Sequence, residues 1–163
     1  MTDSRGGALG RGGGAGIRQG TCRRLARGGM AVGVLGRRIA NAQVVADAIV
    51  AAGGTALAVE ADVADRAAVE RAVATVRAKL GPITVLVNNA GIEEFTPFAE
   101  IDDQAWDRVM AVNLKGSYIA TQAVLPDMLA AGWGRIVNLT ALGAQIGAAS
   151  ATNPSSMMKR TML

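Results

Sequence analysis

Apolar residues follow two alternating patterns from residue 31 onward. Short continuous apolar runs are typical of strands that are buried on both faces, and they occupy residues 31–35, 56–59 and 83–87. Residues 135–139 (RIVNL) are a further expected strand. Longer segments repeat their apolar residues at helical spacing, and they occupy residues 39–52, 65–80, 102–110 and 117–131. Asp65 and Asp102 are the first residues of two of these segments and are predicted N-caps.

The alternation of strands and helices predicts an α/β fold, a Rossmann-type doubly wound parallel sheet, over residues 1–149. Residues 6–11 are the expected first strand, although three glycines and an arginine weaken their strand character. Residues 150–163 show no apolar period, so we predict a disordered tail there.

Composition excludes several classes of site. The chain has 163 residues, one cysteine (Cys22) and no histidine, which excludes Ser-His-Asp and Cys-His catalysis and removes most zinc sites, because structural N and S ligands are lacking. We therefore expect no metal. Since no apolar run reaches the length of a membrane span and the N-terminus lacks the layout of a signal peptide, we expect a cytoplasmic protein without a membrane partner.

Positive charge is concentrated near the N-terminus. The net charge is +4, and Asp3 is the only acidic residue among the first 38, which hold Arg5, Arg11, Arg18, Arg23, Arg24, Arg27, Arg37 and Arg38. Such a segment attracts phosphate, either on a dinucleotide or on nucleic acid. Arg/Gly tracts that bind RNA usually contain aromatic residues, but the first aromatic residue here is Phe95. We therefore expect no nucleic-acid partner.

A glycine-rich segment, RGGGAGIR, precedes the first expected helix at residues 21–27. Gly12 and Gly16 have the spacing of a turn that lets a helix N-terminus approach a pyrophosphate, and Ile17 follows them. A flexible Gly/Arg linker explains the same residues equally well.

Gly36 and Arg37 follow the second expected strand, where a Rossmann fold contacts the adenosine ribose. An acidic residue there would bind the 2′-hydroxyl of NAD, whereas the Arg37 guanidinium suits the 2′-phosphate of NADP. We therefore predict NADP as the preferred cofactor, with NAD as the alternative. A solvated helix start with two surface arginines is the competing interpretation.

Three further polar groups follow predicted elements in order. They are Asp62 with Val63, the Asn88–Gly91 segment (NNAG), and Asn113. Each could be a simple turn, but ligands of open α/β sheets bind where the strands reach their carboxyl ends. Their common placement favours a ligand site.

Together the segments RGGGAGI, GRR, ADV, NNAG, VNLKGS and GRIVNL resemble the short-chain dehydrogenase/reductase family, over residues 8–149. The resemblance is to its 3-oxoacyl-carrier-protein reductases and related alcohol or acyl-CoA dehydrogenases. It implies hydride transfer between NADP(H) or NAD(H) and a small-molecule carbonyl or secondary alcohol. It also implies that Asp62 and Val63 contact the adenine, that Asn89, Ala90 and Gly91 line the cofactor, and that Asn113 holds a proton-relay water.

The chain departs from the family pattern at the catalytic positions. The Ser, Tyr and Lys of the family fall on Ala141, Pro154 and Met158, and Thr140 is a weak substitute for the Ser. Tyr118 is the only tyrosine and lies well before this site. An early end relative to the family implies a truncated chain with a sheet that is incomplete at its C-terminus. We therefore predict an impaired catalyst.

The alternative is a fragment that binds a dinucleotide without catalysis or pairs with an intact homologue. Residues 117–131 resemble a helix that the family uses for subunit contact, which implies that the chain can form a homo-oligomer.

Overall fold

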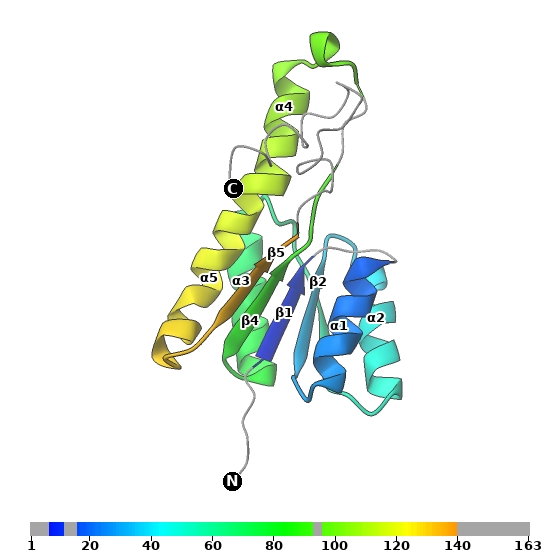
Figure 1. The fold of residues 1–163 in the computed structure, drawn as a ribbon, viewed down its shortest axis with the longest axis vertical. Helices are drawn as coiled ribbons and strands as arrows, with labels where there is room; N and C mark the ends of the chain where they lie inside the picture. Colours follow the sequence, from blue (N-terminus) through cyan, green and yellow to red (C-terminus); the bar gives the residue numbers. More distant parts are fainter. Residues whose placement is uncertain (1–6, 12–15, 93–95, 140–163) are drawn as a thin grey trace.

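The computed structural model describes residues 7–11, 16–92 and 96–139, which form a layered α/β structure (Figure 1). The strands in this part of the chain are β1 (Gly7–Arg11), β2 (Val32–Gly36), β3 (Ala56–Glu60), β4 (Ile83–Asn88) and β5 (Arg135–Asn138). The α-helices are α1 (Ile17–Arg27), α2 (Ile39–Ala51), α3 (Arg66–Leu80), α4 (Asp103–Met110) and α5 (Gly116–Ala130). The predicted Rossmann-type α/β fold is confirmed.

All strand pairs are parallel, and the strand order is β3-β2-β1-β4-β5. Ala8 of β1 pairs with Val32 of β2 on one side and with Val85 of β4 on the other. The chain therefore builds outward from β1 to β3 and then crosses back to β4. Ligands of such sheets bind at this reversal, outside the carboxyl ends of the strands.

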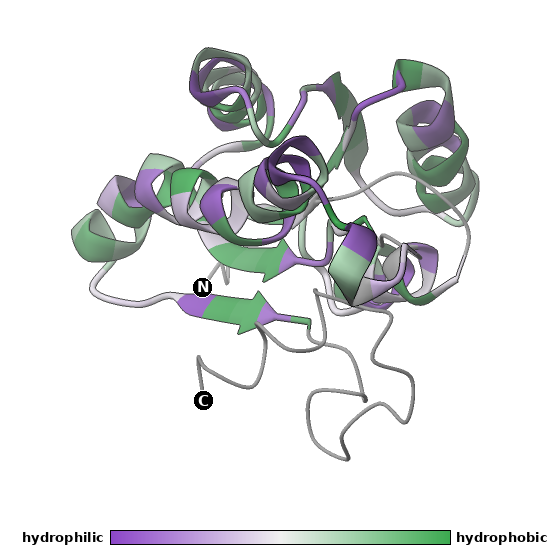
Figure 2. Ribbon diagram, turned by 90° about the horizontal axis from the view of Figure 1, so that it is seen from above, coloured by the Kyte–Doolittle hydropathy of each residue, from purple (hydrophilic) through white to green (hydrophobic). Residues whose placement is uncertain are grey.

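Helices cover both faces of the sheet (Figure 1). Cys22, Val45 and Ile49 of α1 and α2 form one core cluster with Ala8. Leu9, next in β1, belongs to the second cluster, whose helical residues come from α3 and α5. Figure 2 shows mostly hydrophobic strands and helices that mix both colours. Burial on both faces explains why the strands read as continuous apolar runs.

Glycine in β1 permits close packing. A Cβ atom on Gly10 would lie 2.5 Å from the sulfur of Cys22 on α1, which is shorter than van der Waals contact allows. Gly7 also leaves little room, since its Cβ would lie 3.2 Å from the Pro82 carbonyl oxygen. Two of the glycines that weaken the strand pattern, Gly7 and Gly10, thus let the neighbouring loop and α1 pack against the central strand.

Both predicted N-caps are confirmed. The Asp65 carboxylate accepts a hydrogen bond from the Ala68 amide (3.2 Å), and the Asp102 carboxylate accepts one from the Ala105 amide (2.7 Å). Helix α1 begins at Ile17, four residues before the expected start. There, Gly16 turns the chain with a φ of 99°, a conformation that favours glycine.

The structure adds one helical element that was not expected. Helices α4 and α5 lie close to their expected positions, and a π-helical turn at Ala111–Lys115 joins them into one continuous helical segment. Asn113, for which a simple turn was the competing interpretation, lies within this π-helical turn. Such turns are rare and frequently occur at functional sites.

Strand β5 forms one edge of the described sheet, and its side chains Ile136 and Val137 are 39% and 47% exposed. The predicted tail at 150–163 lies outside the described residues. Among the helices of the described part, none has the length and apolar character needed to cross a membrane.

Candidate cofactor site

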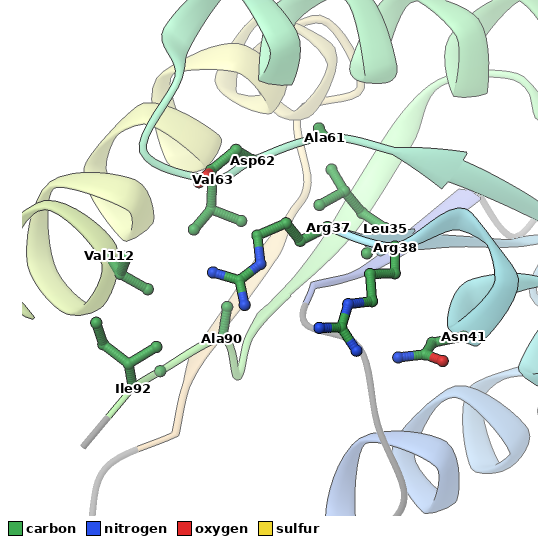
Figure 3. Close-up of a pocket in the computed structure, with 12 residues that line it drawn as sticks. Leu35, Arg37, Arg38, Asn41, Ala61, Asp62, Val63, Ala90, Ile92 and Val112 are labelled. Atoms are coloured by element: carbon green, nitrogen blue, oxygen red, sulfur yellow. The ribbon is translucent and has the colours of Figure 1, made fainter. Parts of the chain in front are cut away.

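A pocket of about 270 Å³ opens beside the carboxyl ends of β2, β3 and β4 (Figure 3). The π-helical turn contributes Val112 to its wall. Five of the predicted cofactor residues line the pocket, and they are Arg37, Asp62, Val63, Ala90 and Gly91. Residues from three separate sequence segments therefore meet at the edge of the sheet where a ligand was expected.

The polar wall of the pocket comes from the start of α2. Arg37, Arg38 and Asn41 line it, and their side chains make no hydrogen bond or ion pair with any other described residue. The backbone N–H of Asn41 donates to the Arg38 carbonyl (3.1 Å), which fixes the first turn of α2 and leaves the Asn41 side chain to the pocket. This turn contains no acidic residue. Two unpaired guanidinium groups and an amide thus favour an anionic ligand such as a phosphate.

The opposite wall is mainly aliphatic. Val63, which is buried, belongs to this wall together with Ala90, Ile92 and Val112 (Figure 3). The Asp62 carboxylate is turned to the chain that follows it, since its Oδ1 accepts a hydrogen bond from the Ala64 amide (2.9 Å). A ligand that combines a flat apolar ring with a phosphate would fit a pocket that has one aliphatic wall and one cationic wall.

Asn113 lies behind this aliphatic wall and fixes its backbone. Its Oδ1 accepts a hydrogen bond from the Ile92 amide (2.8 Å), and its Nδ2 donates to the Ile92 carbonyl (2.9 Å). A Cβ on Gly91 would lie 3.4 Å from the same Oδ1, in ordinary van der Waals contact. Asn113 therefore positions the segment that follows β4.

Asn88 joins the ends of β4 and β5. Its side chain is buried, and its Nδ2 donates to the Asn138 Oδ1 (2.9 Å). The Leu139 amide donates to the Asn88 carbonyl (2.9 Å), so the chain leaves β5 beside the pocket edge. Next in sequence is Thr140. Thr140 and the catalytic positions Ala141, Pro154 and Met158 lie outside the described residues.

Three predicted cofactor residues do not line this pocket. Gly16 and Ile17 form the start of α1, where Ile17 is 72% exposed, and Asn89 follows β4. Gly12 lies outside the described residues. Among the described residues there is no group of three or more His, Cys, Asp or Glu side chains that could hold a metal ion.

Sequence reasoning did not single out Asn41, Ile92 and Val112, and it gave no role of its own to Arg38. Arg38 is the extended N-cap residue of α2 and Asn41 lies in the first helical turn, so helical spacing gave no signal that would pair them. Ile92 and Val112 come together only through the crossover from β4 to the long helix, which leaves no local signal in the sequence.

The strand order, the helical layers and the pocket at the reversal define a nucleotide-binding type of α/β fold. A family model described as short chain dehydrogenase matches residues 8–156. The chain therefore belongs to the short-chain dehydrogenase family, as its motifs predicted.

Individual relatives agree with this assignment. The short-chain reductase protein NovJ of Streptomyces niveus is 42% identical over 142 residues, which cover 87% of this chain and 54% of that protein. A 3-ketoacyl-ACP reductase from Sinorhizobium meliloti superposes with a TM-score of 0.88 at 34% identity, covering 95% of this chain and 62% of that chain.

An actinorhodin polyketide ketoreductase, solved with NADPH, also has a TM-score of 0.88 at 33% identity, covering 99% of this chain and 63% of that chain. The chain spans about half the length of the curated relatives that it matches.

Proposed function

We propose that this chain is the cofactor-binding part of a cytoplasmic oxidoreductase that uses NADP(H). In the intact protein, a hydride would pass between the nicotinamide and a small-molecule carbonyl or secondary alcohol. The observation that carries the proposal is the pocket beside β2, where the side chains of Arg37, Arg38 and Asn41 have no partner among the described residues and stand opposite an aliphatic wall.

Preference for NADP(H) over NAD(H) rests on charge. Gly36 ends β2 where an acidic residue would bind a ribose 2′-hydroxyl and repel a 2′-phosphate. Two arginines follow instead, and nothing acidic lies in the first turn of α2. The NADPH bound to the polyketide ketoreductase supports this preference by analogy.

Thermal unfolding of the purified chain with and without NADPH and NADH tests the proposal. Because a ligand stabilises the folded state by mass action, NADPH at 100 times its dissociation constant should raise stability by about 2.7 kcal/mol. We expect NADH to produce a smaller rise at the same concentration. An unfolding midpoint that neither cofactor changes would show that the pocket does not bind a dinucleotide.

We further propose that this chain by itself is a poor catalyst. Ala141, Pro154 and Met158 carry no group that can donate or accept a proton, and Thr140 offers only a hydroxyl for the substrate oxygen. NADPH absorbance with a panel of ketones should decay no faster than in buffer. Ketone-dependent oxidation of NADPH that scales with protein concentration would overturn this proposal.

A second proposal concerns pairing through α5. Tyr118, Leu125 and Leu129 are 53%, 39% and 71% exposed and share one helical face, while Ile119, Val124 and Met128 form the buried face. An exposed apolar stripe with this spacing suits packing against a second helix. We therefore propose a homo-oligomer, or a pair with a homologue, through α5.

Light scattering after size-exclusion chromatography tests the pairing. The unaltered chain should have twice the monomer mass, and L129E should have the monomer mass because it places a charge in the stripe. V44E is the matched control, since Val44 is 64% exposed but lies on α2. A monomer at every concentration would rule out self-pairing.

A further inference from the structure

A second pocket lies at the far end of α1 and α2 from the cofactor pocket. It has a volume of about 430 Å³ and lies between the last turns of the two helices, which run side by side (Figure 1). Arg23 and Arg27 of α1 line it, together with Ala48, Ile49 and Ala52 at the end of α2. The two pockets share no lining residue, and the length of α2 separates them by about 15–20 Å.

We propose that this second pocket binds a small organic phosphate. Arg23 and Arg27 hold the phosphate group, and the apolar floor of the pocket holds a short aliphatic body. The proposed cofactor binding does not use this site, so the inference is independent of that binding. A bound ligand would link the last turn of α1 to the end of α2.

Two guanidinium groups supply the charge that such a ligand requires. Arg23 and Arg27 are four residues apart, so their side chains lie on the same face of α1. Neither side chain forms a hydrogen bond or an ion pair within the described part of the chain. Like charges at this spacing repel each other, and a phosphate that accepts hydrogen bonds from both groups removes that repulsion.

The two helices contain little negative charge that could neutralise these arginines. Residues 17–51 hold six arginines and one acidic residue, Asp47. The Asp47 carboxylate accepts a hydrogen bond from Gln43 Nε2 (2.7 Å) on its own helix, and it does not line the pocket. The positive potential of the pocket therefore attracts an anion from solution.

A favourable interaction with the helix dipole explains only part of this charge. Arg24 and Arg27 lie in the last turn of α1, where a cation stabilises the helix end. Arg23 precedes that turn, and it lines the pocket, whereas Arg24 does not. The pairing of Arg23 with Arg27 at one pocket is thus better explained by a ligand than by the helix end.

The floor of the pocket is apolar, and short side chains leave it open. Ile49 is 2% exposed, and Ala48 and Ala52 contribute only methyl groups. Gly53 and Gly54 follow at the end of α2 and also line the pocket. Gly53 has a φ of 81°, which favours glycine, and a Cβ atom on it would meet no other atom within 4 Å. An aliphatic chain of a few carbons fits such a space.

Titration of the ¹⁵N-labelled full chain with inorganic phosphate and with n-butyl phosphate, followed by amide chemical shifts, tests the site. The R37Q/R38Q background removes the charge of the cofactor pocket, and KCl keeps the ionic strength constant. We expect saturable shifts of the Gly53 and Gly54 amides with both probes. n-Butyl phosphate should bind about threefold to tenfold more tightly, because part of its chain is buried against Ile49.

Three variants in this background separate the charge from the floor. R23Q should raise both dissociation constants by about tenfold, as for a lost charge-assisted hydrogen bond. R24Q is the matched control, because it removes the same charge from the same helix outside the pocket, and it should change both constants by less than about twofold. A52L keeps the charge but fills the pocket, so n-butyl phosphate should lose its advantage over inorganic phosphate.

Three outcomes overturn the inference. Amide shifts of Gly53 and Gly54 that never saturate with either probe would mean that the pocket holds no phosphate. Equal losses of affinity in R23Q and R24Q would mean that phosphate responds to the charge of α1 as a whole. Equal affinities of the two probes for the R37Q/R38Q chain would mean that the floor binds no aliphatic body.

Discussion

At the residue scale, Asn113 has the clearest structural role in the site. Its amide satisfies both backbone groups of Ile92, at 2.8 and 2.9 Å, and so joins the π-helical turn to the pocket wall. N113A should lower the free energy of unfolding by about 1–2 kcal/mol, because the backbone groups lose their partners. Urea unfolding measures this loss.

The matched control for that prediction is another asparagine of the pocket. N41A should leave the free energy of unfolding within about 0.5 kcal/mol of the original, since the Asn41 side chain is exposed and bonds to no other described residue. Equal stability of N113A and the unaltered chain would show that the Ile92 bonds contribute nothing to the fold.

The sequence identified residues of the pocket wherever a local motif marks the end of a strand. Arg37 follows β2 directly, and Asp62 and Gly91 come shortly after β3 and β4, so their place at the sheet edge could be predicted. The partner of Asn113 could not be predicted, because Ile92 lies 21 residues away and carries no polar side chain. The directions of the Arg37 and Arg38 side chains in Figure 3 could not be predicted either, because they depend on the packing around each side chain.

At the element scale, the contact of β1 with α1 depends on the absence of a side chain. G10A should destabilise the fold by about 1–3 kcal/mol, because the new methyl group would lie 2.5 Å from the Cys22 sulfur. C22A removes that sulfur, so the double variant G10A/C22A should lose less stability than the sum of the single changes. Chemical unfolding of all four chains measures the coupling.

Additive losses in that cycle would mean that Gly10 does not meet Cys22 as the structure shows.

The elements differ in how well the sequence could predict them. Strands β2 and β4 have continuous apolar runs, so they were predicted directly. Strand β1 was the weakest prediction, because close packing requires the glycines that weaken a strand pattern. The π-helical turn has no known sequence signal and was missed.

At the scale of the whole molecule, the alternation of elements predicted the parallel sheet, but the strand order came only from the structure. The crossover that returns the chain to β4 brings the ends of β2, β3 and β4 to one pocket. No local pattern records that return, because it is decided by which helix covers which face. The pocket therefore depends on the strand order as well as on the local motifs that follow each strand.

The charge of the whole molecule also affects how strongly the pocket attracts the cofactor. The chain carries a net charge of +4, and the arginines of the pocket are exposed, so salt should screen their attraction for phosphate. Between about 0.1 M and 1 M salt the Debye length falls from about 10 Å to about 3 Å. Because NADPH carries one more phosphate than NADH, its dissociation constant should rise more steeply with salt, by about tenfold against about threefold.

Titrations with both cofactors at several KCl concentrations measure these slopes, and urea unfolding at the same concentrations shows whether the fold itself responds to salt. The double variant R37Q/R38Q should bring the NADPH slope close to that of NADH, because the charged partners of the extra phosphate are then gone. Equal slopes for the two cofactors in the unaltered chain would mean that the 2′-phosphate gains nothing from the charge of this pocket. A preference for NADPH would then have to come from uncharged contacts alone.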